Sequence, residues 1–364
     1  MDSIDANNSI IVNVGNSGNT ANSGIVGNVV DTVNLSNVIY GSNDSNSGIV
    51  LITRGRPMAQ QLNRDALDRV IAVINGKGGV LKTTLTANIG GMLASSGYKV
   101  LLVDLDPQGN LAEDLGYTDT ERDDQGKSLA QALLFGGGAE PLRNIRPNLD
   151  VFAGGLELDQ ATAGLVAKAN KDREGAQLAV ARILEPLAGN YDMILLDCPP
   201  GDETLQTAAV AAARWALVPV KTDKSSRKGL SAVAARLDGV IGINPSLDLL
   251  GVVLVDTGTG SHVIQREARD HIASLFNSDR DVAFEATVRH SEATAQATRE
   301  RGLLVQELDE HVRKGPKWYE IRRGEATAEA LAPRTASSVA DDLFAITQEL
   351  VARITAAETK EQRA

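Results

Sequence analysis

Short apolar runs alternate with longer amphipathic stretches through most of the chain after residue 68. The runs that have the length and β-branched content of buried strands span 70–74, 99–104, 149–153, 192–197, 215–220 and 249–255. The pattern predicts helices between them at 84–96, 158–187 and 228–241. Strands and helices that alternate in this way indicate an α/β fold, with a mostly parallel, doubly wound sheet covered by helices on both faces.

The end of the chain, residues 337–357, has the apolar spacing of an amphipathic helix. We expect this helix to pack on the core rather than on a membrane, because many of its flanking residues are acidic. The chain also lacks a run of 18 apolar residues, so we expect no membrane span. Residues 358–364 form a short tail.

The first 53 residues have a different composition, without Lys, Arg or Glu. The string Asn-Ser-Gly-Ile-Val at 22–26 recurs at 46–50, with a looser copy at 8–12. Asparagine and glycine favour turns, and β-branched pairs favour short strands. The segment is therefore expected to be disordered or weakly β-forming. Two alternatives stay open: a self-association or docking arm, or an artefact in which Met58 is the true start. Residues 54–68 resemble a linker with a short helix.

Residues 76–84 form a glycine-rich turn between the first core strand and the first helix. Strand, glycine loop, helix and strand in this order are typical of a phosphate-binding loop, where backbone N–H groups and the helix N-terminus converge on a polyphosphate. Lys82 can reach the β- and γ-phosphates, and the Thr83 hydroxyl can ligate Mg²⁺. Right-handed crossovers place Lys82, Asp106 and Asp197 along one edge of the sheet.

One residue departs from the usual phosphate-loop pattern, because Leu81 stands where the template has glycine before the lysine. If the loop forces Leu81 into a φ > 0 conformation, the strain costs about 1–3 kcal/mol. That strain would weaken nucleotide binding by roughly five- to over a hundredfold. If φ is already helical and the side chain points away from phosphate, the cost is small. The sequence leaves both possibilities open.

The loop and the segments after it resemble a known family. Lys77-Gly-Gly-Val-x-Lys-Thr-Thr84, followed by Asp-Leu-Asp-Pro-Gln-Gly-Asn at 104–110, is similar to the deviant Walker A ATPases of the ParA/MinD group. The second string points to the ParA partition branch. The resemblance continues through residues 191–201 and covers most of 69–350, but not the first 60-odd residues. It implies a P-loop NTPase domain over 69–357 that binds ATP and Mg²⁺ and hydrolyses ATP slowly, with stimulation by a partner.

The resemblance also implies a role for each matching residue. Lys77 is the additional lysine that reaches across an ATP-sandwich homodimer, and Lys82 holds the phosphates. Asp106 matches the position that orients the attacking water. Asp197 matches the Walker B acid that holds the metal through water, beside the direct ligand Thr83. Asp104 is expected to support the metal or the loop. The implied nucleotide-binding residues are Gly76, Lys77, Gly78, Gly79, Val80, Leu81, Lys82, Thr83 and Thr84.

The formal net charge of −11 means that any DNA binding must come from a local basic patch. Each basic cluster could equally be a solvated charged face. The resemblance implies that at least one of them binds double-stranded DNA non-specifically. The first cluster is Lys221, Lys224, Arg227 and Lys228; the second is Arg313, Lys314, Lys317, Arg322 and Arg323, with Trp318 and Tyr319 inside the run.

The cysteine content and the N-terminus limit the compartment. A single cysteine, Cys198, excludes an intrachain disulfide and fits a reducing cytosol. It also excludes the relatives that hold a metal–sulfur cluster through paired cysteines. The four histidines lack metal-ligand spacing, and no basic region precedes an apolar stretch as in a signal peptide. We therefore expect a cytoplasmic, nucleoid-associated protein.

The sequence is compatible with three functions. The first is a partition ATPase that segregates plasmid, phage or chromosomal DNA with a ParB-like centromere-binding partner. The second is a scaffold in which Leu81 has impaired nucleotide binding. The third is a relative that positions a cargo other than DNA. A dead site has no physical need for Lys77, Lys82, Asp106 and Asp197 together, so the sequence favours an active ATPase.

Overall fold

The computed structural model describes residues 9–13, 38–41, 49–53, 62–258, 262–276, 282–315, 322–323 and 333–363. The chain divides into two compact units, residues 1–62 and 63–364. In the first unit, β1 (Ser9–Asn13), β3 (Ile49–Thr53) and β2 (Val38–Gly41) pair as an antiparallel sheet in that order. Strands β1 and β3 overlap two of the sequence repeats. The roles of residues 1–53 and of the 54–68 linker stay predictions, and Met58 lies outside the described residues.

The second unit is built on an eight-stranded sheet with the order β11-β10-β9-β4-β8-β5-β7-β6. All neighbouring strands are parallel except the β6–β7 pair. The predicted α/β fold with a mostly parallel sheet is therefore confirmed. The strands span Val70–Val73 (β4), Val100–Asp104 (β5), Leu142–Arg146 (β6), Leu149–Phe152 (β7), Met193–Asp197 (β8), Trp215–Val220 (β9), Asp248–Thr257 (β10) and Ala283–Arg289 (β11).

The two strands that the sequence pattern did not predict, β6 and β11, form the two edges of the sheet. Edge strands contact one neighbour instead of two, so they do not need a continuous apolar run. Their sequences, LRNIR and AFEATVR, are correspondingly mixed. Buried central strands such as β8 and β9 are apolar along their whole length and were found from the sequence.

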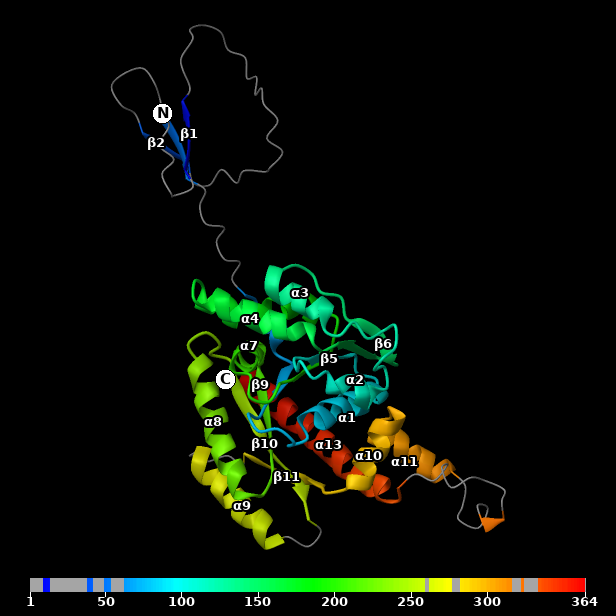
Figure 1. Cartoon of the computed structure of the whole chain (residues 1–364). Coiled ribbons are helices and arrows are strands. Elements are labelled where there is room, and N and C mark those ends of the chain that lie inside the picture. The colour runs from blue at the N-terminus through cyan, green and yellow to red at the C-terminus, as the bar shows by residue number, and fades with distance from the viewer. Residues whose placement is uncertain are drawn as a thin grey trace. The chain divides into compact units, whose positions relative to one another are not determined.

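Helices cover both faces of this sheet (Figure 1). Helices α1 and α13 pack on one face, and α7, α8 and α9 contact strands from the other side. The helices span Lys82–Ser95 (α1), Asn110–Leu115 (α2), Lys127–Phe135 (α3), Glu157–Ala169 (α4), Arg173–Gln177 (α5), Ala179–Ala188 (α6), Glu203–Ala212 (α7), Lys224–Val240 (α8), His262–Phe276 (α9), Glu292–Arg301 (α10), Val305–Lys314 (α11) and Thr335–Glu361 (α13).

The prediction of one helical stretch over 158–187 was wrong, because this segment forms α4, α5 and α6. The break follows from Asp172, whose side chain accepts the N–H of Gly175 and so caps the start of α5. An aspartate that caps a helix stabilises a new helix start in preference to continuation of the preceding one.

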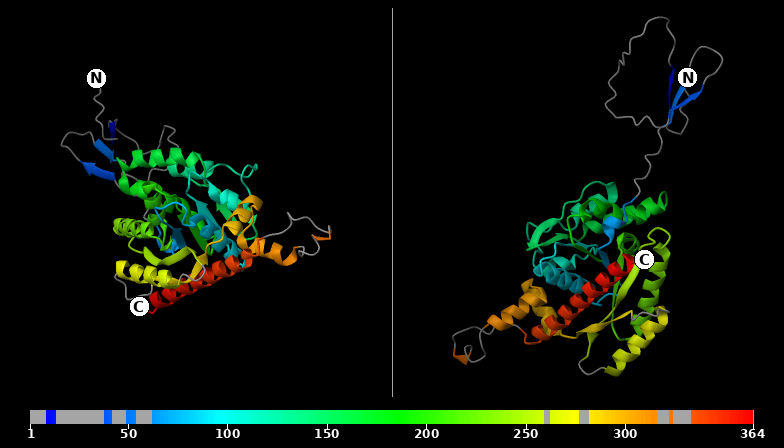
Figure 2. Two further views of the ribbon diagram at one scale, coloured as in Figure 1. Left: turned by 60° about the horizontal axis from the view of Figure 1, so that its bottom comes forward. Right: turned by 180° about the vertical axis from the view of Figure 1, so that it is seen from behind.

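Helix α13 confirms the predicted amphipathic helix and its packing on the core. Its apolar side chains Val339, Leu343, Ile346, Leu350 and Ile354 are all buried in the main hydrophobic cluster. The helix runs diagonally across the second unit, from the region of α11 to the C-terminus (Figure 2). Among the described residues, no helix combines the length and apolarity needed to cross a membrane.

Helix α1 is buried on nearly all sides, which fixes the phosphate loop at its N-terminus. An added Cβ at Gly90 would lie 2.5 Å from Leu102 of β5, and one at Gly91 would lie 2.1 Å from Leu304. The two glycines therefore let α1 lie directly between the sheet and the start of α11. Residues from Leu85 to Ala94 are buried. A helix held in this way gives the loop before it a rigid base.

Candidate nucleotide site

The glycine-rich loop runs from the end of β4 to Lys82, the first residue of α1. Its start is held by Asn75, which is fully buried. The Asn75 side chain donates to the carbonyl of Pro219 on β9 (2.8 Å) and accepts the N–H of Lys77 (2.9 Å). These two bonds join the start of the loop to the neighbouring strand and so fix its position at the carboxyl edge of the sheet.

Lys82 lies under this loop and is only 6% exposed. Its ammonium donates to the carbonyl of Lys77 at 3.1 Å, which curls the side chain back across the loop. Burial lowers the pKa of Lys82, while the nearby acids Asp197 and Asp106 act in the opposite direction. A buried lysine at the junction of a glycine-rich loop and a helix N-terminus is the arrangement that binds the terminal phosphates of a nucleotide.

Leu81 has φ 60° and ψ 26°, which is the left-handed conformation. Of the two possibilities left open by the sequence, the helical φ is therefore excluded. Its carbonyl still accepts the N–H of Leu85 (2.9 Å), so α1 begins without distortion. A leucine held at this φ costs about 1–3 kcal/mol. Because the folded loop already has this conformation, the cost falls on folding.

Asp197 ends β8 beside the loop and is 1% exposed. Neither of its carboxylate oxygens has a hydrogen-bond partner among the described residues. Burial raises the pKa of Asp197 to about 7, while the neighbouring Thr83 hydroxyl and Lys82 ammonium lower it. Two buried carboxylate oxygens that make no hydrogen bond of ordinary geometry within the described part of the chain and lie near a threonine hydroxyl fit a site for a hydrated cation.

Asp104 lies opposite Asp197 in the register of β5 and β8 and is fully buried. Its two oxygens accept the backbone N–H groups of Asp106 (2.9 Å) and Leu111 (3.2 Å). Burial and the adjacent Asp197 raise the pKa of Asp104 well above its usual range. Of its two expected roles, the geometry favours support of the 105–111 loop over contact with a metal.

Asp106 stands on that supported loop, 6% exposed. Its carboxylate accepts the N–H of Gln108 (2.9 Å), and its carbonyl accepts the N–H of Gly155 (3.1 Å). Burial raises the pKa of Asp106, and the N–H of Gln108 and the charge of Lys82 lower it. The loops that follow β4, β5 and β8 thus bring Lys82, Asp106 and Asp197 together, as the sequence predicted.

No group of three or more His, Cys, Asp or Glu residues that could hold a metal occurs in the described part of the chain. Magnesium does not need one, because it keeps water ligands and is usually held by one or two carboxylates together with substrate phosphates. Asp197 and Thr83 therefore fit Mg²⁺ bound with a nucleotide.

Comparisons with known proteins agree with this geometry. The AAA_31 family model, described as an AAA domain, matches residues 68–249. The chain is 32% identical over 229 residues to the chromosome partitioning protein ParA of Caulobacter vibrioides, covering 62% of this chain and 83% of that protein. It is 40% identical over 209 residues to the chromosome-partitioning ATPase Soj of Thermus thermophilus, covering 57% and 77%.

The chain belongs to the ParA/MinD superfamily of P-loop ATPases.

Solved structures support the same fold. The cell division ATPase MinD of Pyrococcus furiosus superposes with a TM-score of 0.53 at 23% identity, over 78% of this chain and 98% of that one. A Mycobacterium smegmatis cobyrinic acid a,c-diamide synthase with a bound ATP analogue and magnesium has a TM-score of 0.50 at 28% identity, over 64% and 92%. This ParA/MinD member therefore shares a fold that holds nucleotide and magnesium in a solved neighbour.

A cavity of about 300 Å³ lies next to the phosphate loop of this ParA/MinD member, and sequence reasoning missed it. Leu81 and Thr84 line it from the loop side. Its polar part contains Asp256 of β10, which holds the ammonium of Lys221 at 2.7 Å and the imidazole of His290. The sequence feature that could have indicated this cavity is a polar residue at or just past the carboxyl end of each of β9, β10 and β11.

Among the members of the first basic cluster, the structure describes the side chain of Lys221. Lys221 lines the cavity and is paired with Asp256, as described above. Lys224, Arg227 and Lys228 belong to the first turns of α8, but their side chains lie outside the described residues.

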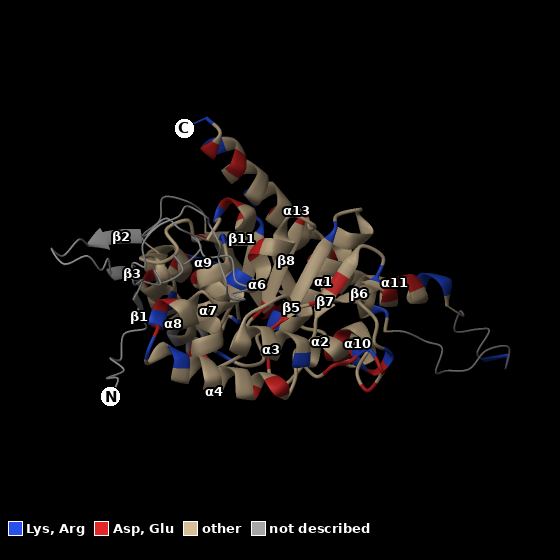
Figure 3. Ribbon diagram, turned by 90° about the horizontal axis from the view of Figure 1, so that it is seen from above, with Lys and Arg blue, Asp and Glu red and all other residues tan. Residues whose placement is uncertain are grey.

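The second basic cluster is at and beyond the end of α11. Arg313 and Lys314 are exposed, and each pairs with an acid one turn earlier, Asp309 and Glu310. Arg322 and Arg323 are exposed. Lys317, Trp318 and Tyr319 lie outside the described residues. In Figure 3 the ribbon of α11 has both acidic and basic positions, with Lys and Arg at its C-terminal end.

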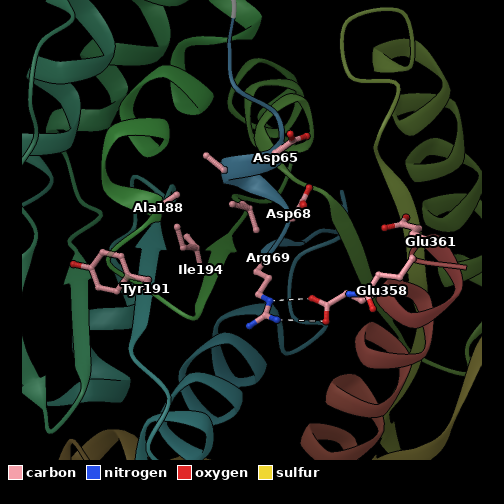
Figure 4. A pocket seen from close by; sticks show the side chains of 11 residues that line it. Asp65, Asp68, Arg69, Ala188, Tyr191, Ile194, Glu358 and Glu361 are labelled. Atoms are coloured by element: carbon pink, nitrogen blue, oxygen red, sulfur yellow. Dashed lines mark hydrogen bonds and ion pairs between the residues drawn. The ribbon is translucent and has the colours of Figure 1, made fainter.

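A larger cavity, about 570 Å³, lies at the opposite edge of the sheet (Figure 4). It is lined by residues at the amino ends of strands, such as Val70, and by the end of α13. Arg69 crosses it to pair with Glu358 at 2.9 Å. Ligands of open α/β sheets bind outside the carboxyl ends of the strands, so the smaller cavity beside the loop is the better candidate for part of the nucleotide site.

Proposed function

We propose that this chain is an ATP-dependent partition ATPase. Its loop binds MgATP, ATP binding joins two copies in a sandwich homodimer, and slow hydrolysis separates them. The observation that carries this proposal is the pair of buried carboxylate oxygens of Asp197, which have no hydrogen-bond partner of ordinary geometry among the described residues and lie near the Thr83 hydroxyl and the buried Lys82. A buried acid without partners is costly in a folded protein unless a ligand completes its surroundings.

In the proposed reaction, each side chain acts on one part of the nucleotide. Lys82 neutralises the β- and γ-phosphates, and Thr83 and Asp197 hold Mg²⁺, Asp197 through water. Magnesium supplies charge stabilisation for phosphoryl transfer. Asp106 orients the attacking water. Lys77 of one copy reaches the nucleotide of the other and adds positive charge where negative charge develops.

The biological part of the proposal rests on the relatives. The similar proteins of Caulobacter vibrioides and Thermus thermophilus are named for chromosome partitioning. We propose that this chain likewise binds double-stranded DNA non-specifically through basic residues such as Arg322 and Arg323. A ParB-like partner would stimulate hydrolysis and release it from a nucleoid in the cytoplasm. The cargo is then plasmid, phage or chromosomal DNA.

The test is MgATP binding by titration calorimetry. The unaltered protein is expected to bind with micromolar affinity, and Lys82→Ala is expected to abolish binding because the terminal phosphates lose their counter-charge. Lys171→Ala, which removes an exposed lysine after α4, is the matched control and should bind normally. Absence of binding by the unaltered protein would reject the ATPase proposal in favour of a nucleotide-impaired scaffold. A relative that positions another cargo would bind ATP in the same way and differ only in its partner.

A further inference from the structure

We propose that Leu81 is a nucleoside-contacting residue, whose side chain forms the wall between the phosphate loop and the adjacent 300 Å³ cavity. This inference rests on the proposed ATP binding and assigns a ligand to one end of the same site. It replaces the interpretation of Leu81 as a defect of the loop. On this inference, the side chain of Leu81 strengthens nucleotide binding.

The backbone at Leu81 shows that the leucine keeps the shape expected at the glycine position. Its φ of 60° is close to the 70° of Gly79, two residues earlier in the loop. A residue other than glycine stays in this conformation only where its surroundings hold it there, and such residues cluster at ligand-binding sites. The contacts of the side chain therefore have to offset the backbone strain.

Those contacts are with the apolar side of the cavity. Leu81 is half-buried and packs against the main core cluster. Val288 from β11 and Val339 and Leu343 from α13 line the same cavity. Leu81 is thus the apolar residue of the loop that faces both the core and the cavity, and a planar apolar group that entered the cavity would contact it.

The opposite side of the cavity is polar. Asp256 lies between Lys221 and His290, which supply hydrogen-bonding groups to the same space. A nucleoside has matching chemistry, with an apolar base face and polar ribose hydroxyls and base edges. The volume of about 300 Å³ is at the lower end of the range for small-ligand sites.

The position of the cavity also favours a nucleoside over other ligands. Thr84 belongs both to the phosphate loop and to the cavity lining. The ribose is joined directly to the phosphates, so a nucleotide whose phosphates lay on residues 78–84 would have its ribose near this loop. The cavity beside Thr84 is therefore the space that the ribose and base would enter.

A comparison of the unaltered protein with three Leu81 variants tests this inference against the alternative that backbone strain at Leu81 weakens nucleotide binding. Leu81→Met keeps both the strain and the apolar wall, whereas Leu81→Ala keeps the strain and removes the wall. Leu81→Gly removes both. The dissociation constant for MgATP is measured for each variant and for the unaltered protein by titration calorimetry, with circular dichroism as the check of folding. Ile241→Ala, at a half-exposed position far along the chain after α8, is the control for removal of an apolar side chain.

If Leu81 contacts the nucleoside, the Met variant binds within about twofold of the unaltered protein, and the Ala and Gly variants bind roughly tenfold more weakly because the apolar contact is lost. Tighter binding by the Gly variant, or equal binding by all four, would overturn the inference while leaving the ATPase proposal intact. If the unaltered protein bound no MgATP, the ATPase proposal itself would fail with it. If Leu81→Ala does not fold, the contrast between near-normal binding by Leu81→Met and weaker binding by Leu81→Gly still decides.

Discussion

Lys77 and Asp223 form an ion pair, with the lysine ammonium 2.8 Å from the carboxylate of a residue just past β9. The lysine proposed to act on the nucleotide of a second copy is therefore held within its own subunit. Both side chains are partly exposed, so the pair is expected to contribute only about 0.2–1 kcal/mol. A contact of that size can bias dimer formation without preventing it.

Asp223→Asn is accordingly expected to favour the ATP-dependent dimer by roughly two- to fivefold, because Lys77 no longer has to leave a charged partner. The measurement is the dimer dissociation constant with MgATP by sedimentation velocity. Asp238→Asn, at an exposed position on α8, is the matched control. An unchanged constant in Asp223→Asn would show that the pair does not oppose dimer formation.

The buried side chain of Asp114 is expected to make the stability of the folded protein depend on pH. It is buried in α2, with one oxygen lacking a hydrogen-bond partner and Arg299 of α10 at 3.6 Å from the other. Burial raises the pKa of Asp114 to about 6. The folded state therefore holds a proton that the unfolded state has lost between about pH 4 and pH 6, and stability falls as pH rises through this window.

Asp114→Asn should consequently stabilise the protein at pH 7.5 by on the order of 1–3 kcal/mol, and by much less at pH 4.5. Arg299→Ala should do the reverse, destabilising mainly above pH 6 because the charged Asp114 loses its nearby cation. Thermal unfolding at the two pH values measures both effects. Equal shifts at both pH values would mean that Asp114 does not titrate in this window.

Alanine substitutions at Gly302 and Gly239 are expected to change the free energy of unfolding in opposite directions. Gly116 and Gly302, which end α2 and α10 in left-handed conformations, lie backbone to backbone, and a Cβ on Gly302 would lie 2.3 Å from the Gly116 Cα. Gly302→Ala is therefore expected to lower the free energy of unfolding by more than about 2 kcal/mol. Gly239→Ala, in α8 with open space around it, should raise the free energy of unfolding by about 0.5–1 kcal/mol. Urea titrations of both variants test the contrast, and a tolerated Gly302→Ala would contradict the tight helix contact.

The exposed basic pair Arg322 and Arg323 predicts a salt-dependent loss of DNA binding. Replacement of both by alanine should weaken non-specific binding to double-stranded DNA and reduce the slope of log affinity against log salt concentration by about 2. Fluorescence anisotropy at several salt concentrations gives this slope. The double variant Lys168→Ala, Lys171→Ala on another surface controls for the change in net charge, and an unaltered slope in the arginine variant would exclude this patch.

The sequence by itself determined the central strands, the phosphate loop and the long C-terminal helix. These features are encoded locally. A buried strand needs an apolar run, the loop needs glycines at fixed spacing beside Lys82, and a helix packed on a core needs apolar residues on one face. The edge strands β6 and β11 escaped because they contact only one neighbouring strand and carry mixed sequences.

Only the tertiary structure decided the hydrogen-bond and ion-pair partners of the individual polar side chains. The sequence left open whether Asp104 supports the metal or the loop, and the structure shows that backbone N–H groups occupy its oxygens, whereas those of Asp197 have no hydrogen-bond partner among the described residues. The sequence assigned Lys221 to a basic patch, whereas the lysine pairs with Asp256 beside the loop. The order of the strands in the sheet fixes these outcomes, because contacts between segments far apart in the chain depend on packing and not on local spacing.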